Sequence, residues 1–333
     1  DEYFKDKNII EQTLNLRPHD EIFFIQTKEE PTTQEIDGLH TKIIKDKDIK
    51  PAAIVAIGGG ITLDTGKAIS NLLTNGGSAS DYQGWDLLKK PGLFKIGIPT
   101  ISGTGSEATR TCVMTNKESG LKLGMNSDYS VFDRVILDPN LTKSVPRDQY
   151  FYTGMDAYIH CLEALNGSYR NAVGDAFSRE TLKLCSEVFT DNEMMSDTNR
   201  EKLMVASYLG GASIATSYVG VVHPFSAGLS VVLGIHHCEA NCIVMNVMDE
   251  FYPDEHNDFI NMLRLQNIKL KNNVCKNLDD EQYEMLYQAT IVHEKPLTNA
   301  LGDEFKKILT KEKKQFYYYP YFYSLQIPLL CLT

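Results

Sequence analysis

Basic residues are in the minority along this chain of 333 residues, which has 33 Lys and Arg against 44 Asp and Glu. The net charge of −11 argues against the basic surface that nucleic acids or anionic membranes attract, so we expect neither as a partner. Zinc-knuckle spacing is absent from the cysteines, and their number, seven, is odd. This usage fits a reduced, cytoplasmic setting best.

Long apolar runs are also missing where a targeting segment would need one. Residues 1–15 are charged and lack a continuous apolar core, so no signal peptide is predicted. Between Ser207 and Ile235 there is no Asp, Glu, Lys or Arg, and this stretch is long enough to span a bilayer. It is rich in Gly, Ser and Thr, however, and Pro224 interrupts it. We therefore predict a pair of buried helices there and no membrane span.

Strand and helix patterns alternate in the first part of the chain. They predict strands at 21–26, 52–57 and 95–99, and helices at 2–15, 32–44 and 62–73. Alternation of this kind predicts a mostly parallel sheet in an α/β domain. No strand pattern precedes the first helix, so we expect the first strand of this Rossmann-like domain to be missing from the sequence.

Long helical patterns take over from about Pro146. They predict helices at 147–166, 172–190, 199–217, 226–250 and 280–309. We therefore expect an α/β domain over 1–145 and an all-α domain over 146–310. The remaining tail, 311–333, combines a lysine cluster with a run of Tyr and Phe, matches neither helix nor strand periodicity, and is expected to be irregular.

Two loops rich in Gly, Ser and Thr follow predicted strands, at 58–60 and 102–106. Glycine lets the backbone approach a pyrophosphate closely, and the N-terminus of the following helix offers free N–H groups. Both loops come at carboxyl ends of expected parallel strands, which is the edge where such sheets bind ligands. The spacing matches neither the dinucleotide fingerprint nor a P-loop. A nucleotide site and a pair of tight turns therefore both remain open.

A carboxylate and an imidazole that could share a metal ion lie in the first long helix of the second domain. Asp156 and His160 are four residues apart, which places them on one face of a helix. His223 lies in the charge-free stretch, and a buried imidazole needs a partner. Together with His237 it could complete a divalent-metal site. The alternative is an ordinary surface or capping pair with two unrelated histidines.

These segments, in this order, resemble the iron-containing (group III) alcohol dehydrogenase family over about residues 1–310. The matching segments are GGGITLDTGKA, PTISGTGSEATRTCVMTN, GMDAYIHCLEALNG and HPFSAGLSVVLGIHHCEAN. The family holds its metal with one Asp and three His, and the same spacings of four, sixty-three and fourteen residues occur here. The resemblance assigns the metal, and with it the catalytic centre, to Asp156, His160, His223 and His237. It implies a dehydroquinate synthase-like fold.

A divalent metal, Fe²⁺ or Zn²⁺, and a nicotinamide cofactor, NAD or NADP, are further implications of the resemblance, as is a homodimer. The positions that it assigns to the cofactor are Gly58, Gly59, Gly60, Asp64, Thr100, Ser102, Thr104 and Lys122. This chain departs from the family at Ile61, where a serine usually follows the glycines, and at Ala227, where the family often has a histidine near the nicotinamide.

At a finer level, the run DYQGWDLLKKPGLFKIGIPTISGTGSE resembles one branch of the family. That branch oxidises C8 of 3-deoxy-D-manno-octulosonate to an aldehyde, a step in the biosynthesis of an 8-amino sugar of lipopolysaccharide. An acidic sugar would need a cation near the site, and Arg110, Arg147 and Arg170 are candidates. The alternatives are a dehydrogenase for another alcohol or polyol, a dehydroquinate synthase-like lyase, and a non-catalytic copy.

Overall fold

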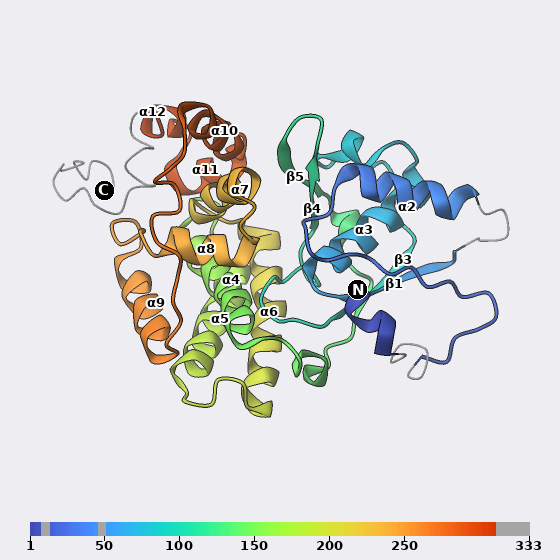
Figure 1. Ribbon diagram of the computed structural model, residues 1–333, viewed down its shortest axis with the longest axis horizontal. Helices are drawn as coiled ribbons and strands as arrows, with labels where there is room; N and C mark the ends of the chain where they lie inside the picture. Colours follow the sequence, from blue (N-terminus) through green and yellow to red (C-terminus); the bar gives the residue numbers. More distant parts are fainter. Residues whose placement is uncertain (8–13, 46–50, 311–333) are drawn as a thin grey trace.

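The computed structural model describes residues 1–7, 14–45 and 51–310. Figure 1 shows two parts side by side, one of strands and helices from the first half of the chain and one of helices from the second half. This confirms the predicted fold class, an α/β part followed by a helical part. The irregular tail predicted at 311–333 lies outside the described residues.

The N-terminal part combines short strands with two long helices. Its elements in chain order are η1 (Glu2–Lys7), α2 (Thr33–Lys45), β1 (Ala53–Gly58), α3 (Gly60–Asn75), η2 (Ala79–Tyr82), β2 (Gly84–Trp85), β3 (Phe94–Pro99), β4 (Thr111–Asn116), β5 (Leu121–Asn126), η3 (Asp128–Ser130), β6 (Arg134–Val135) and η4 (Pro139–Thr142). Within this part, α3 packs against β1, β3 and β4, and its apolar residues join those of α2, β4 and β5 in one core.

Two small sheets organise these strands. The first has the order β1-β3-β6 and is parallel throughout, as predicted. The second has the order β2-β5-β4; β4 and β5 form an antiparallel hairpin that turns at Gly120, and β2 adds to β5 in parallel. This mixed sheet was not predicted: β2 is only two residues long, whereas β4 and β5, of six residues each, are as long as β1 and β3.

Residues 21–26 correct one prediction. Their apolar, β-rich composition predicts a strand, but the structure gives them no ladder hydrogen bonds. A strand requires a partner strand alongside it, and in the described part of the chain the nearest pairing is a single bridge between Thr32 and Thr115. The helix expected at 2–15 is a 3₁₀ helix over Glu2–Lys7, and residues 8–13 lie outside the described residues.

The C-terminal part is a packed set of helices. In chain order they are α4 (Arg147–Asn166), α5 (Ala172–Thr190), α6 (Asp197–Ser217), α7 (Val222–Leu233), α8 (His237–Met245), α9 (Pro253–Leu265), α10 (Asp280–Ile291), α11 (Glu294–Leu301) and α12 (Phe305–Ile308). The central helix is α4, which contacts α5, α6 and α8 and buries 14 of its 20 residues. Several of those buried residues are polar, and buried polar groups need partners.

Two of the predicted long helices are divided in the structure. The helix expected at 226–250 is two helices, because Gly234 adopts a left-handed conformation (φ 65°) and ends α7 with a bond from its N–H to Ser230 O. The helix expected at 280–309 is divided into α10, α11 and α12, with Gly302 at the end of α11. Helix α9 had no counterpart among the predictions.

The charge-free stretch 207–235 forms the end of α6 and all of α7. No single helix in the described residues is long and apolar enough to cross a bilayer. The pair α6 and α7 would meet the length and composition test together, but the two helices are bent by 106° relative to each other. Much of α7 is buried inside the protein, as expected for a pair of core helices.

Candidate metal and cofactor site

The structure brings the four predicted metal ligands together on three helices. Asp156 and His160 lie one turn apart on α4, His223 is the second residue of α7, and His237 is the first residue of α8. The Nε2 atoms of His160, His223 and His237 lie 3.6, 3.4 and 3.8 Å from Asp156 Oδ1. Donor atoms of Asp156, His223 and His237 all lie within 4.8 Å of one another.

Burial and charge together set the protonation of this cluster. Burial alone would raise the pKa of Asp156, but the neighbouring imidazoles of His160 and His237 hold it well below its usual value. Burial lowers the pKa of His160 to about 4, and burial together with the Lys122 ammonium lowers that of His237 to about 3. At neutral pH the cluster therefore presents a carboxylate and at least two neutral imidazoles, which are the forms that bind a metal.

Glu163 is a functional residue that the sequence analysis missed. Its carboxylate hydrogen-bonds His223 Nδ1 and accepts the Val222 backbone N–H at 2.5 Å. Against the effect of burial, this carboxylate and Asp156 raise the pKa of His223 to about 9. A carboxylate on the far nitrogen of a ligand histidine fixes the orientation of the ring. The available signal was its position, three residues after His160 and on the same helix face.

The donor set fits a divalent ion. Each of the three imidazoles directs Nε2 towards one carboxylate oxygen in a buried place, and one Asp with three His suits Fe²⁺ or Zn²⁺. The amide nitrogen of Asn241 lies among the same atoms, 2.6 Å from Asp156 Oδ1 and 3.3 Å from Nε2 of both His223 and His237. Asn241 therefore marks the point at which the donors converge.

The glycine turn lies at the start of α3, where the helix has no side-chain cap. A Cβ on Gly58 would lie 2.6 Å from Thr62 Oγ1, and one on Gly59 would lie 3.0 Å from the Ile101 side chain. A Cβ on Gly60 would lie 3.3 Å from the side chain of Thr104. The glycines therefore let this turn pack against the second loop.

Free hydrogen-bonding groups surround the glycine turn. The first N–H groups of any helix have no intrahelical partner. The buried hydroxyls of Thr62 and Ser102 also have no hydrogen-bond partner in the described residues. Thr100 joins the two loops through a bond from its N–H to Gly58 O of 3.0 Å. The N–H and hydroxyl groups in this place fit the phosphates of a dinucleotide.

Asp64 and Lys122 have partners within the protein. Asp64 accepts hydrogen bonds from the Ser106 hydroxyl at 2.5 Å and the Val113 N–H at 2.8 Å, and burial raises its pKa. It therefore ties the second loop to β4. Lys122 on β5 is buried and pairs with Glu30 at 2.9 Å, close enough to His237 to lower the pKa of that imidazole.

The second loop also joins the two parts of the molecule. A Cβ on Gly103 would lie 1.5 Å from Thr153 O of α4, and one on Gly105 would lie 2.6 Å from Gly211 of α6. Across the same boundary, the Ser207 hydroxyl donates to Glu107 Oε1 at 2.7 Å. The loop that is expected to hold the cofactor thus packs closely against α4, the helix that carries Asp156.

The three arginines considered for an acidic substrate have other partners. Arg110 pairs with Asp86 and Asp128, and Arg170 makes a two-pronged contact with Asp175. Arg147 donates to Gln266 at 2.9 Å. None of these pairs involves a residue of the ligand cluster.

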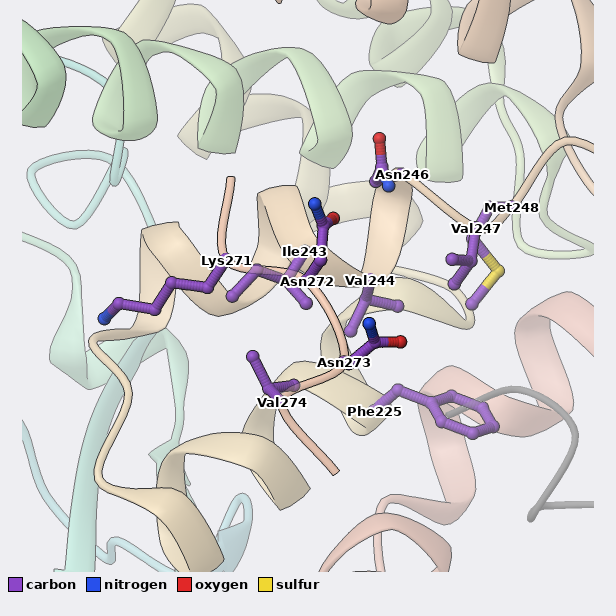
Figure 2. A pocket seen from close by; sticks show the side chains of 10 residues that line it. All are labelled: Phe225, Ile243, Val244, Asn246, Val247, Met248, Lys271, Asn272, Asn273 and Val274. Atoms are coloured by element: carbon purple, nitrogen blue, oxygen red, sulfur yellow. The ribbon is translucent and has the colours of Figure 1, made fainter. Parts of the chain in front are cut away.

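A small pocket lies beside α8, and none of its lining residues is one of the four predicted metal ligands. Figure 2 shows its lining side chains, which come from α7, α8 and the segments that follow α8 and α9. The lining is apolar or amide except for Lys271, which pairs with Glu239 at 3.0 Å. None of the residues that line this pocket belongs to the cluster of Asp156.

The chain thus joins an α/β part, with a glycine turn at the start of a helix, to a helical part with a cluster of possible metal ligands. The chain matches the description "Iron-containing alcohol dehydrogenase" over residues 8–139 and "Fe-containing alcohol dehydrogenase family, C-terminal" over residues 150–292. It belongs to the iron-containing alcohol dehydrogenase family.

Individual relatives carry several different names. The chain is 36% identical to a sulfoacetaldehyde reductase of Bilophila wadsworthia over 55% of this chain and 48% of the relative. It is 33% identical to an NAD-dependent methanol dehydrogenase of Bacillus methanolicus over 58% of this chain and 51% of the relative. An iron-containing alcohol dehydrogenase of Thermotoga maritima has a similar structure, with a TM-score of 0.74, 26% identity, and coverage of 90% of this chain and 82% of that one. The chain spans about half the length of the curated relatives it matches.

Proposed function

We propose that this protein is a metal-dependent oxidoreductase that interconverts a primary alcohol and an aldehyde with a nicotinamide acceptor, NAD or NADP. The observation that carries the proposal is that the Nε2 atoms of three imidazoles all lie within 3.8 Å of one carboxylate oxygen, Asp156 Oδ1. Membership of the alcohol dehydrogenase family supports it. The relatives' names point to alcohols and aldehydes as substrates, and one of them names NAD.

Asp156, His160, His223 and His237 would hold the ion, either Fe²⁺ or Zn²⁺. When bound, the ion would act as a Lewis acid that lowers the pKa of the substrate hydroxyl, and the nicotinamide would take up hydride from the carbinol carbon. The residues of the chain supply orientation. Glu163 fixes the ring of His223, and Asn241 holds the carboxylate of Asp156. The turn at Gly58–Gly60 and the hydroxyls beside it would hold the pyrophosphate.

For the substrate, we propose an alcohol that carries a carboxylate. The first compound to assay is 3-deoxy-D-manno-octulosonate, which would be oxidised at C8 in the biosynthesis of a lipopolysaccharide sugar. The resemblance of residues 81–107 to the branch that oxidises this sugar supports the choice. A relative named for sulfoacetaldehyde, which is also an anion, supports an anionic substrate class. A cytoplasmic homodimer is part of the same proposal.

The test combines metal analysis with nicotinamide absorbance. The purified protein is loaded with Fe²⁺ or Zn²⁺ and assayed with NAD and NADP against this sugar and a panel of neutral alcohols. We expect about one bound ion per chain and turnover of at least one alcohol. His223→Ala should lose both the metal and turnover, whereas His19→Ala, an exposed histidine, should keep both. Full metal content and rate in His223→Ala would refute the site.

A further inference from the structure

Lys295 lies in an aromatic cage. Its Nζ is 4.1 Å from the centre of the Trp85 ring, 4.0 Å from that of Tyr218 and 5.9 Å from that of Tyr169. The ammonium donates one hydrogen bond, of 2.7 Å, to the Tyr218 hydroxyl. No ion pair joins it to a carboxylate in the described part of the chain, whereas Lys122 is paired with Glu30. A lysine has three N–H donors, so two remain for a ligand.

The cage is built from both parts of the molecule. Trp85 belongs to β2 of the N-terminal part, and its ring packs edge to face with that of Tyr218, with the ring centres 5.4 Å apart. Tyr169 follows α4, Tyr218 follows α6, and Lys295 lies on α11. Next to Trp85 in the chain, Asp86 pairs with Arg110. Trp85 is 39% exposed, so this wall of the cage faces solvent in part.

The same elements connect the cage to the ligand cluster. Tyr218 precedes His223 by five residues. The Asn299 amide of α11 donates to the carbonyls of Ser217 and Val219 at 3.1 and 2.9 Å, which ties α11 to this segment. Strand β5, which pairs with the strand of Trp85, contacts α7 (Figure 1). Tyr218 and α11 therefore tie the cage to the segment that leads into His223.

We propose that Lys295 binds the carboxylate of the substrate. This inference rests on the proposed function and adds the residue that selects an anionic substrate. Aromatic walls hold the ammonium in place and displace water from around it, which strengthens a charge-assisted hydrogen bond to a carboxylate. The three arginines named from the sequence are paired elsewhere, so Lys295 takes the role first considered for them.

A purely structural role predicts a different result. If Lys295 only clamps the two parts together through its aromatic contacts, its removal should affect every substrate equally. A substrate-binding role should raise KM for an anionic substrate alone. The comparison of charged and neutral substrates therefore separates the two.

The kinetic test uses the metal-loaded protein with nicotinamide and the variants Lys295→Met, Lys295→Arg and Lys183→Met. Lys183 is an exposed control on α5. For 3-deoxy-D-manno-octulosonate we expect Lys295→Met to raise KM by about 10- to 100-fold with little change in kcat, as for loss of a charge-assisted hydrogen bond. Lys295→Arg should recover part of the loss. KM for a neutral primary alcohol should change less than about threefold. Equal losses on both substrates would overturn the proposal.

A binding measurement tests the role of Lys295 without requiring that the protein oxidise any alcohol. Trp85 is the only tryptophan in the sequence, so intrinsic fluorescence reports on the cage directly. We expect the metal-loaded protein, without nicotinamide, to show a saturable change in emission as the same sugar acid is added, and Lys295→Met to show none. That result supports the carboxylate site even if no alcohol is oxidised. A wild-type protein whose emission does not respond, or a variant that responds equally, would overturn it.

Discussion

At the residue scale, the His223–Glu163 contact predicts that metal affinity depends on a residue outside the proposed ligand set. Glu163→Gln keeps the size of the side chain but removes the charge that holds His223 Nδ1. Loss of such a partner typically weakens metal binding by about 10- to 100-fold. We therefore expect Glu163→Gln to keep its fold and to bind Fe²⁺ or Zn²⁺ more weakly by that factor, measured by competition with a chelator of known affinity.

The control for this prediction is Glu180→Gln, a change in an exposed glutamate that pairs with Lys183 on α5. It should leave the affinity unchanged. Equal metal affinity in wild type and Glu163→Gln would show that Glu163 does not position His223.

A second buried carboxylate predicts a pH-dependent effect on stability. Burial raises the pKa of Glu107, which accepts a bond from Ser207 and leaves Oε2 without a partner in the described residues. The folded protein therefore holds this proton to a higher pH than the unfolded chain, and the free energy of unfolding falls as pH rises above the ordinary value near 4.5. Glu107→Gln cannot ionise and escapes this loss.

Glu107→Gln should accordingly be more stable than wild type at pH 8, by about 1–3 kcal/mol, and nearly equal to it at pH 4.5. Urea unfolding of both proteins at the two pH values checks this. A stability difference that does not vary with pH would contradict the raised pKa.

At the scale of elements, helix periodicity predicted α4 at its observed bounds, 147–166, and the four-residue spacing placed Asp156 beside His160. The same periodicity could not divide α7 from α8, because the two neighbours of Gly234, Leu233 and Ile235, are both apolar. The division depends on the left-handed backbone of that glycine. The sequence alone does not reveal this conformation, because a glycine can also lie inside a helix at a cost of about 1 kcal/mol. The strand expected at 21–26 was wrong because pairing needs a neighbour that local composition does not supply.

The loop between β3 and β4 gives a prediction about the joint of the two parts. Gly103 has φ 138°, and a Cβ there would overlap the Thr153 carbonyl of α4. Gly103→Ala should force the loop away from α4, with a loss of stability of about 1–3 kcal/mol or more and weaker nicotinamide binding. Thermal unfolding and quenching of Trp85 by NADH measure the two effects.

Gly120→Ala is the matched control. Gly120 also has a positive φ, of 69°, but a Cβ there would meet no atom within 4 Å. Gly120→Ala should therefore lose only the stability that corresponds to the backbone strain, and its nicotinamide binding should be unchanged. If both variants behaved alike, the close approach of the loop to α4 would have no part in holding the cofactor.

At the scale of the whole molecule, local patterns predicted two parts of different class but not their contact. Asp156 and His237 meet because α5, α6 and α7 bring the chain back to α4 between them, and nothing in the spacing of the residues fixes those reversals. The resemblance to a family proposed the set of four ligands, and the structure places these four side chains near one another. Neither route gave Lys295, because its cage draws Trp85 and Tyr218 from different parts of the molecule.

Because its ligands come from α4, α7 and α8, a bound ion should stabilise the helical part as a whole. A ligand that binds only the folded state adds about 2.7 kcal/mol at a concentration 100 times its Kd, which for a chain of this size corresponds to a rise in Tm of several degrees. We expect chelated protein to recover this increase when Zn²⁺ is added back, and His223→Ala to recover none of it. An equal rise in the variant would mean that the ion acts at another place, and that the cluster around Asp156 does not hold it.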